Sequence, residues 1–215
     1  MLLFDLDGTL VDSAPDLAGA ANDLRAEHGL APLPLAALRP MVGAGARGMV
    51  GVAFGVKPDD ERFAALKDAF LERYAQRLLV HTRLFDAVAP LLDALDAGGQ
   101  RWGIVTNKAM RFTAPIVAGL GLDARAAVVI AGDTTPHAKP HPAPLLEAAR
   151  RVGVAPGQCH YIGDDLRDIQ AGRAAGMATA AAAWGYLGQG EPVEAWGADR
   201  VLHSPDQLLQ WLELA

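Results

Sequence analysis

The sequence predicts an α/β fold, a doubly wound parallel sheet core with an inserted all-helical cap domain. From about residue 80 onward, short apolar runs alternate with helical patterns, and this alternation is typical of βαβ units and a parallel sheet covered on both faces. An apolar run at residues 2–6 precedes this region, and we expect it to join the same sheet. Residues 14–80 show helical patterns alone, which predicts a helical insertion after the first strand.

Two carboxylates, Asp5 and Asp7, follow one another at the end of the first apolar run, in the segment Phe4-Asp5-Leu6-Asp7-Gly8-Thr9. Side chains at positions i and i+2 of an extended chain point to the same face. Neighbouring carboxylates repel each other unless a cation or a shared proton compensates, so the pair indicates a hard divalent ion. Gly8 permits a sharp turn where the strand ends, which is where open α/β sheets bind ligands.

The helical insertion is predicted at residues 14–80, so that residues 1–13 and 81–215 form the catalytic core. Its first helix, residues 15–27, begins with Ser13 and Asp16 at the spacing of a capping box. A long amphipathic helix is expected at residues 59–79. An insertion at this point of the chain is expected to act as a lid over the site.

The remaining elements alternate in chain order, because parallel strands need helical crossovers between them. Gly98-Gly99, for example, ends a helical pattern. The expected helices are residues 87–97, 111–120, 143–152, 166–175 and 205–214, and the expected strands are residues 102–106, 127–131, 159–162, 177–183 and 200–202.

Composition excludes several functional classes. The chain is 51% hydrophobic but has no stretch of roughly 18 uncharged apolar residues to span a bilayer. Asp5 and Asp7 lie where a secretory signal would be apolar, so we expect a cytoplasmic protein. With 19 Lys and Arg against 25 Asp and Glu, the net charge of −6 argues against a nucleic-acid surface and favours a small substrate. A single cysteine, Cys159, forms neither an internal disulfide nor a zinc cluster.

Two polar segments after predicted strands suit a phosphate group. Thr106 and Asn107 come directly after the strand residues Gly103-Ile104-Val105, and a hydroxyl with backbone N–H groups at a helix start can bind phosphate oxygens. Lys139 lies in the proline-flanked run Ala138-Lys139-Pro140-His141-Pro142. A rigidly held lysine can neutralise an anion without reorganisation, so Lys139 is predicted to contact phosphate too.

A last cluster contains three aspartates, Asp164, Asp165 and Asp168, at the end of one apolar run and the start of a helix. This placement suits a metal ion. We predict Mg²⁺ held by the Asp5 carboxylate, the Asp7 backbone carbonyl and Asp164. Asp165 is expected in the outer shell of this site, and Asp168 is expected to orient either Lys139 or a metal-bound water.

These residues predict phosphoryl transfer. Asp5 would attack phosphorus and form an aspartyl-phosphate, while Asp7 would protonate the leaving alcohol and later deprotonate the hydrolytic water. Thr106, the backbone around Asn107, and Lys139 would stabilise charge on the phosphoryl oxygens.

In this order the motifs resemble those of the haloacid dehalogenase superfamily of phosphatases: Asp5-Leu6-Asp7-Gly8-Thr9, Val105-Thr106-Asn107, Lys139-Pro140 and Gly163-Asp164-Asp165. The resemblance covers nearly the whole chain. It implies a core sheet of five parallel strands, magnesium dependence, the roles given above, and a monomer or weak homodimer.

Within the superfamily the chain resembles the phosphoglycolate phosphatase branch through Val105-Thr106-Asn107-Lys108 and Trp184-Gly185-Tyr186, and the N-acetylmuramic acid 6-phosphate phosphatases through residues 43–50 and 81–85. Both implied substrates, 2-phosphoglycolate and N-acetylmuramic acid 6-phosphate, carry a carboxylate as well as the phosphate. A cationic cap residue is therefore expected, and Arg47 is the candidate for substrate specificity.

Other functions remain open. A sugar-phosphate mutase or another phosphotransferase of the superfamily would share all four motifs, whereas a dehalogenase would have no use for Asp7. From a different class, a non-catalytic phospho-receiver or a binding protein would also group aspartates, a threonine and a lysine on such a sheet.

Overall fold

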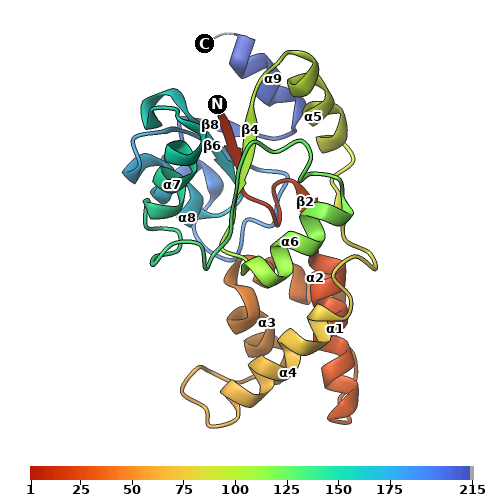
Figure 1. Ribbon diagram of the computed structural model, residues 1–215. Helices are drawn as coiled ribbons and strands as arrows, with labels where there is room; N and C mark the ends of the chain where they lie inside the picture. The colour runs from red at the N-terminus through yellow and green to blue at the C-terminus, as the bar shows by residue number, and fades with distance from the viewer. Residues whose placement is uncertain (214–215) are drawn as a thin grey trace.

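Six parallel strands form the central sheet, in the order β5-β4-β1-β6-β7-β8 (Figure 1). The structure is a computed structural model that describes residues 1–213. The strands are β1 (Leu2–Phe4), β4 (Trp102–Val105), β5 (Val129–Ile130), β6 (His160–Gly163), β7 (Ala178–Ala182) and β8 (Arg200–Leu202). The doubly wound sheet is as predicted, and β8 at its edge makes six strands where the resemblance implied five.

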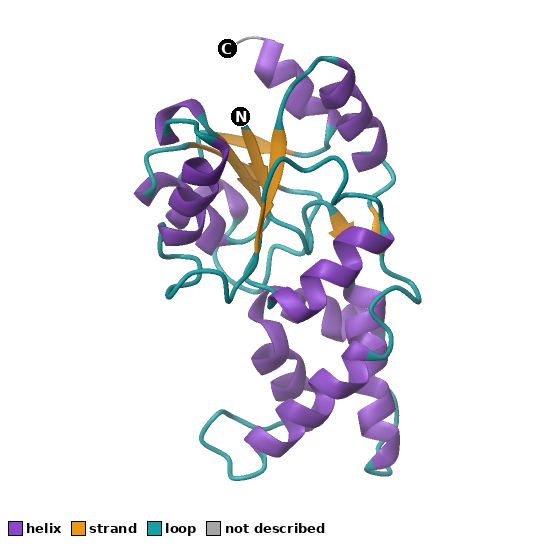
Figure 2. Cartoon of the chain, in the orientation of Figure 1, coloured by secondary structure: helices purple, strands orange, loops and turns teal. Residues whose placement is uncertain are grey.

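Helices cover both faces of this sheet, as the alternating pattern requires (Figure 2). Leu2 and Phe4 of β1 belong to a core shared with α5, α6 and α9, and Leu3 points into a second core shared with α7 and α8. The helices are α5 (Val88–Ala97), α6 (Met110–Gly119), α7 (Ala143–Val152), α8 (Leu166–Ala174) and α9 (Asp206–Glu213). Residue 214, the last of the helix predicted at 205–214, lies outside the described residues.

The insertion after β1 is helical and lies beyond the carboxyl ends of the strands (Figure 1). It contains α1 (Ala14–Glu27), α2 (Leu35–Leu38), the 3-10 turn η1 (Arg39–Ala44), α3 (Gly45–Phe54) and α4 (Phe63–Ala75). Helix α1 packs on both α3 and α4. The glycine-rich helix α3 was not anticipated, and α4 is shorter than the helix predicted at 59–79. Position 48 of α3 requires a glycine, because a Cβ there would lie 2.5 Å from the Ala44 Cβ.

The two connections between core and cap pair with each other. Strands β2 (Val11–Asp12) and β3 (Arg83–Leu84) form an antiparallel ribbon, which sequence reasoning missed because each strand has two residues. Beside it, the buried Asp16 carboxylate accepts hydrogen bonds from the backbone N–H groups of His81 and Thr82 at 2.9 and 2.7 Å, and from the Thr82 hydroxyl at 2.8 Å. The expected capping box is therefore wrong, since Ser13 makes no side-chain cap to α1 and Asp16 joins the two connections.

Within residues 1–213, the helices are all too short or too polar to cross a membrane.

Replacing the Asp16 carboxylate should destabilise the fold. Asp16→Ala leaves three donors of the return connection unpaired in a buried environment, and we expect a loss of about 3 kcal/mol in the free energy of unfolding, measured by urea denaturation. The matched control is Asp23→Ala, which removes a half-exposed carboxylate of the same helix paired with Arg77 and should cost under about 1 kcal/mol. Equal losses in the two variants would contradict the assigned role of Asp16.

Candidate active site

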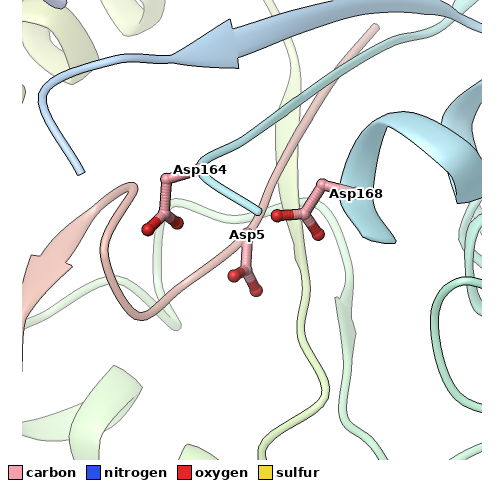
Figure 3. Close-up of side chains that lie close together, drawn as sticks. All are labelled: Asp5, Asp164 and Asp168. Carbon is pink, nitrogen blue, oxygen red and sulfur yellow. The ribbon is translucent and has the colours of Figure 1, made fainter. Parts of the chain in front are cut away.

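Three carboxylates meet at the carboxyl end of the sheet (Figure 3). Asp5 follows β1 and Asp164 follows β6, and because these strands are direct neighbours, their ends bring the two side chains to one edge. Asp168 reaches the same point from the first turn of α8. One carboxylate oxygen from each residue lies within 4.8 Å of the other two.

A buried lysine joins two of these carboxylates. The Lys139 Nζ lies 2.9 Å from the Asp5 Oδ1 and 2.7 Å from the Asp168 Oδ1. It also donates hydrogen bonds to the Tyr161 hydroxyl at 2.7 Å and to the Val105 carbonyl oxygen at 3.0 Å. Burial disfavours the ammonium ion, but the charges of Asp168 and Asp5 outweigh this effect and raise the pKa of Lys139. The amine is thus held charged and immobile beside Asp5.

The negative charge of the three carboxylates, when all are ionised, exceeds the positive charge of the lysine beside them. Burial, opposed by Lys139 and reinforced by Asp168, raises the pKa of Asp5 to about 6. Burial and the charges of Asp5 and Asp168 raise the pKa of Asp164 well above its usual range. One lysine cannot balance three ionised carboxylates, and hard oxygen ligands suit a divalent cation. The donor set therefore fits a metal ion, consistent with the predicted site.

The Asp164 carboxylate is fixed from two sides. Its Oδ1 accepts a hydrogen bond from the Thr9 hydroxyl and its Oδ2 accepts one from the Tyr186 backbone N–H, both at 2.8 Å. Gly8 and Gly185 face it, and a Cβ at either position would collide with the carboxylate side chain. Gly8 also has a φ of +87°, a conformation that glycine adopts readily. The turn after β1 therefore gives Asp164 room to reach the site.

Asp165 is not one of the three clustered carboxylates, although it lines the same pocket. Its carboxylate caps α8 by accepting a hydrogen bond from the Arg167 backbone N–H at 2.9 Å, and it pairs with the Arg167 guanidinium at 2.7 Å. Asp168 completes a capping box by accepting from the Asp165 backbone N–H at 3.0 Å. The Arg167 guanidinium also donates to the Gly43 carbonyl oxygen of the cap. Asp165 thus stabilises the helix start and a contact between core and cap.

Asp7 lies apart from the three clustered carboxylates. Its side chain pairs with the Lys108 Nζ at 3.0 Å and accepts a hydrogen bond from the Ser13 hydroxyl. The Asp7 carboxylate is therefore separate from the candidate metal ligands, and a contact to the ion would come from its backbone, as we predict. Sequence reasoning gave Lys108 and Ser13 no role at the site, although Lys108 belongs to the quoted Thr106 motif.

Thr106 and Asn107 lie at the end of β4, next to β1. The Thr106 hydroxyl is buried and accepts a hydrogen bond from the Lys108 backbone N–H at 3.2 Å. The Asn107 side chain binds the Lys139 backbone twice, donating to its carbonyl oxygen and accepting from its N–H, both at 2.9 Å. Asn107 thus positions the loop that carries Lys139, and its side-chain amide is occupied by this contact.

These groups open into a pocket of about 270 Å³ between core and cap. The core supplies Asp5, Asp7, Lys139 and Asp164. The cap supplies mainly apolar side chains, among them Leu17, Val42, Phe70, Leu71 and Tyr74. A polar cluster on the core side of the pocket thus lies under an apolar roof formed by the cap.

The structure does not bring Arg47 to this pocket. Arg47 is exposed on α3 and lines a separate hollow with Arg167 and the loop at residues 187–191. Besides Lys108, sequence reasoning missed Arg111, a cation that lines the pocket from α6. The helical pattern alone did not indicate that Arg111 faces the cap.

Known proteins resemble the whole chain. The family model described as haloacid dehalogenase-like hydrolase matches residues 2–182. A phosphoglycolate phosphatase of Xanthomonas campestris pv. campestris is 50% identical over 96% of this chain and 93% of its own length. An N-acetylmuramic acid 6-phosphate phosphatase of Pseudomonas aeruginosa is 42% identical over 100% of this chain and 95% of its own.

A solved structure agrees with these relatives. The crystal structure of a predicted phosphoglycolate phosphatase from Haemophilus somnus has a TM-score of 0.86 and 29% identity, and the match covers 99% of this chain and 97% of that one.

Fold, site and relatives together define an α/β enzyme with a cluster of buried carboxylates beneath a helical cap. The chain belongs to the haloacid dehalogenase-like hydrolase family. The predicted superfamily is therefore confirmed, as is the prediction of a hydrolase.

Cation binding at the site should depend on pH, because the Asp5 carboxyl has a pKa of about 6 without a metal. Above that pH, Asp5 is ionised and free to bind. Below it, a proton must first leave, so the ionisation of Asp5 alone should lower the affinity for Mg²⁺ by about fivefold from about pH 6 to about pH 5, with proton release on binding. Calorimetric titration with MgCl₂ in buffers of different ionisation enthalpy measures both effects. Equal affinity at the two pH values would contradict the assignment of Asp5 as a ligand.

Proposed function

We propose that this protein is a Mg²⁺-dependent phosphomonoester hydrolase that acts through an aspartyl-phosphate on Asp5. The observation that carries the proposal is the division of the carboxylates. Asp5 lies with Lys139 and the candidate metal ligands, whereas the Asp7 side chain lies outside that cluster beside the same pocket. One carboxylate is thus available as nucleophile and the other as acid and base.

The cation site would be formed by the Asp5 and Asp164 carboxylates and the Asp7 backbone carbonyl. A bound Mg²⁺ would neutralise phosphoryl charge and keep Asp5 ionised. Asp168 lies 2.7 Å from the Lys139 Nζ, which supports a role for Asp168 in orienting that lysine.

In the first step, an Asp5 carboxylate oxygen attacks phosphorus while the bond from phosphorus to the substrate oxygen breaks. Asp7 donates a proton to the departing alkoxide, which leaves as an alcohol. In the second step, Asp7 removes a proton from water as the water oxygen attacks phosphorus. The bond to Asp5 then breaks, inorganic phosphate leaves, and both carboxyl groups return to their starting states.

The phosphoryl oxygens would be bound by Lys139, the Thr106 hydroxyl and the backbone N–H groups near Asn107. All three residues line the pocket. The Asn107 side chain supports this arrangement indirectly, since it holds the loop of Lys139.

We propose that residues 14–80 act as a cap that covers the pocket during turnover and excludes water. Its apolar lining and the paired connections β2 and β3 support this role. A cap that opens and closes would let substrate enter and product leave.

The substrate proposed is a small phosphorylated metabolite with a carboxylate, either 2-phosphoglycolate or N-acetylmuramic acid 6-phosphate. The names of two relatives support these candidates. Contact of Arg47 with that carboxylate stays a prediction, and it would require the cap to move, since Arg47 lies outside the pocket. We also propose a cytoplasmic monomer or weak homodimer without nucleic-acid or membrane partners.

The nucleophile can be tested directly. Asp5→Asn should lower kcat for phosphate release by at least about a thousandfold, because the amide is a poor nucleophile. Phosphate release is measured with MgCl₂ over 2-phosphoglycolate, N-acetylmuramic acid 6-phosphate and hexose phosphates, and circular dichroism checks the fold. Asp68→Asn, an exposed carboxylate on α4, serves as the control and should keep full activity. Undiminished turnover in Asp5→Asn would refute the assignment.

The same assay separates hydrolysis from phosphotransfer. A hydrolase releases inorganic phosphate and incorporates one oxygen from ¹⁸O-labelled water into it, because water attacks the aspartyl-phosphate. Transfer of phosphate between sugar positions without release would favour the mutase, and a stable phosphoprotein that does not turn over would favour a phospho-receiver.

A further inference from the structure

Two cations and two aromatic rings form a row along one side of the pocket, which we call the cation–aromatic row: Lys108, Tyr74, Phe112 and Arg111. The Lys108 Nζ lies 4.7 Å from the centroid of the Tyr74 ring, and the Tyr74 and Phe112 rings are 5.4 Å apart. The Arg111 Cζ lies 4.4 Å from the centroid of Phe112. All four residues line the pocket.

The two ends of the row differ in what they bind. At the inner end, Lys108 is paired with Asp7 at 3.0 Å. At the outer end, the Arg111 side chain is exposed and packs on the Phe112 ring, and among the described side chains it has no ion-pair or hydrogen-bond partner. The other two cations of the pocket, Lys139 and Arg167, are both paired with carboxylates. Arg111 is thus the pocket cation whose donors are free within the described part of the chain.

Arginine at such a position suits a carboxylate. Its guanidinium presents parallel donors that match the two oxygens of a carboxylate. The Phe112 ring beneath it fixes the plane of the guanidinium and reduces the conformational freedom lost on binding.

The space between Lys108 and Arg111 is apolar, so it suits the apolar part of a substrate. Two aromatic rings separate the cation beside Asp7 from Arg111, and Phe70 and Leu71 line the same pocket from α4. A molecule with its carboxylate next to its phosphate has nothing to place against these rings. A sugar ring with acyl or methyl substituents does, because its apolar faces pack on aromatic side chains.

We propose that Arg111 is a specificity-determining residue that binds the carboxylate of a phosphorylated sugar acid, with the sugar body packed along the cation–aromatic row. This inference rests on the proposed function, which places the phosphate at Asp5. It selects the longer of the two proposed substrate types, in which a sugar ring separates the phosphate from the carboxylate.

The test uses two substrates that differ by one group. N-acetylmuramic acid 6-phosphate carries a lactyl carboxylate that N-acetylglucosamine 6-phosphate lacks. In Arg111→Ala, the ratio of kcat/KM for the acidic over the neutral sugar should fall by about tenfold or more, mainly through KM, because a charge-assisted bidentate contact is lost. Arg111→Lys should recover part of the ratio, since it restores the positive charge but not the two parallel donors of the guanidinium.

Two further variants are compared with it. Arg150→Ala, on the distant α7, is the matched control and should leave the ratio unchanged. Arg47→Ala tests the rival cation of the cap. The inference is overturned if Arg111→Ala lowers kcat/KM by the same factor for both sugars, or if Arg47→Ala alone changes the ratio. It is also overturned if the wild type prefers 2-phosphoglycolate and Arg111→Ala lowers kcat/KM for 2-phosphoglycolate by the same factor as for N-acetylmuramic acid 6-phosphate.

A binding measurement separates this inference from the proposed function. Calorimetry compares Asp5→Asn with the double variant Asp5→Asn/Arg111→Ala, both titrated with N-acetylmuramic acid 6-phosphate. Weaker binding by the double variant supports Arg111 even if the wild type releases no phosphate, an outcome that would refute the proposed function alone. Equal binding by the two variants refutes the role of Arg111 whatever the activity.

Discussion

The site depends on the crowding of buried carboxylates around one lysine. Asp5, Asp164 and Asp168 meet because neighbouring strands end at one edge and α8 begins there, and only Lys139 among residues 1–213 lies close enough to pair with two of them. Burial and mutual repulsion make this arrangement costly without a further cation. The protein therefore maintains a site whose electrostatics are incomplete on its own, and the missing charge is one that a metal ion can supply.

The rest of the molecule keeps that crowded arrangement in place while a cap covers it. Asp16 holds the return connection beside β2 and β3, and Arg167 binds both Asp165 and the cap carbonyl of Gly43. These polar contacts lie at the seam between cap and core, whereas the pocket lining on the cap side is apolar. Polar groups thus define how the two parts meet, and the apolar roof limits water near the clustered carboxylates.

Sequence reasoning succeeded where a local pattern determines the outcome. An apolar run followed by an aspartate and a glycine places Asp5 at a strand end whatever the rest of the chain does. It failed where the partners of a side chain are distant in the sequence. The spacing of Ser13 and Asp16 fits a capping box, but the Ser13 hydroxyl donates to the Asp7 carboxylate, and the Asp16 carboxylate accepts from the Thr82 hydroxyl. Arg47 and Arg111 illustrate the same limit, because sequence does not say which arginine of a helix faces a pocket closed by another segment.

On the proposed function, the choice of substrate depends on the residues where cap and core meet, and not on the motifs that carry Asp5, Thr106, Lys139 and Asp164. The residues proposed to bind phosphate follow strand ends of the core, and every member of a family built on that sheet can share them. Tyr74 and Phe112, in contrast, come from cap and core and touch only because α4 lies over α6. Changes in either helix alter the row without disturbing Asp5 or Lys139. On the proposed function, relatives that share Asp5 and Lys139 can therefore act on different phosphomonoesters.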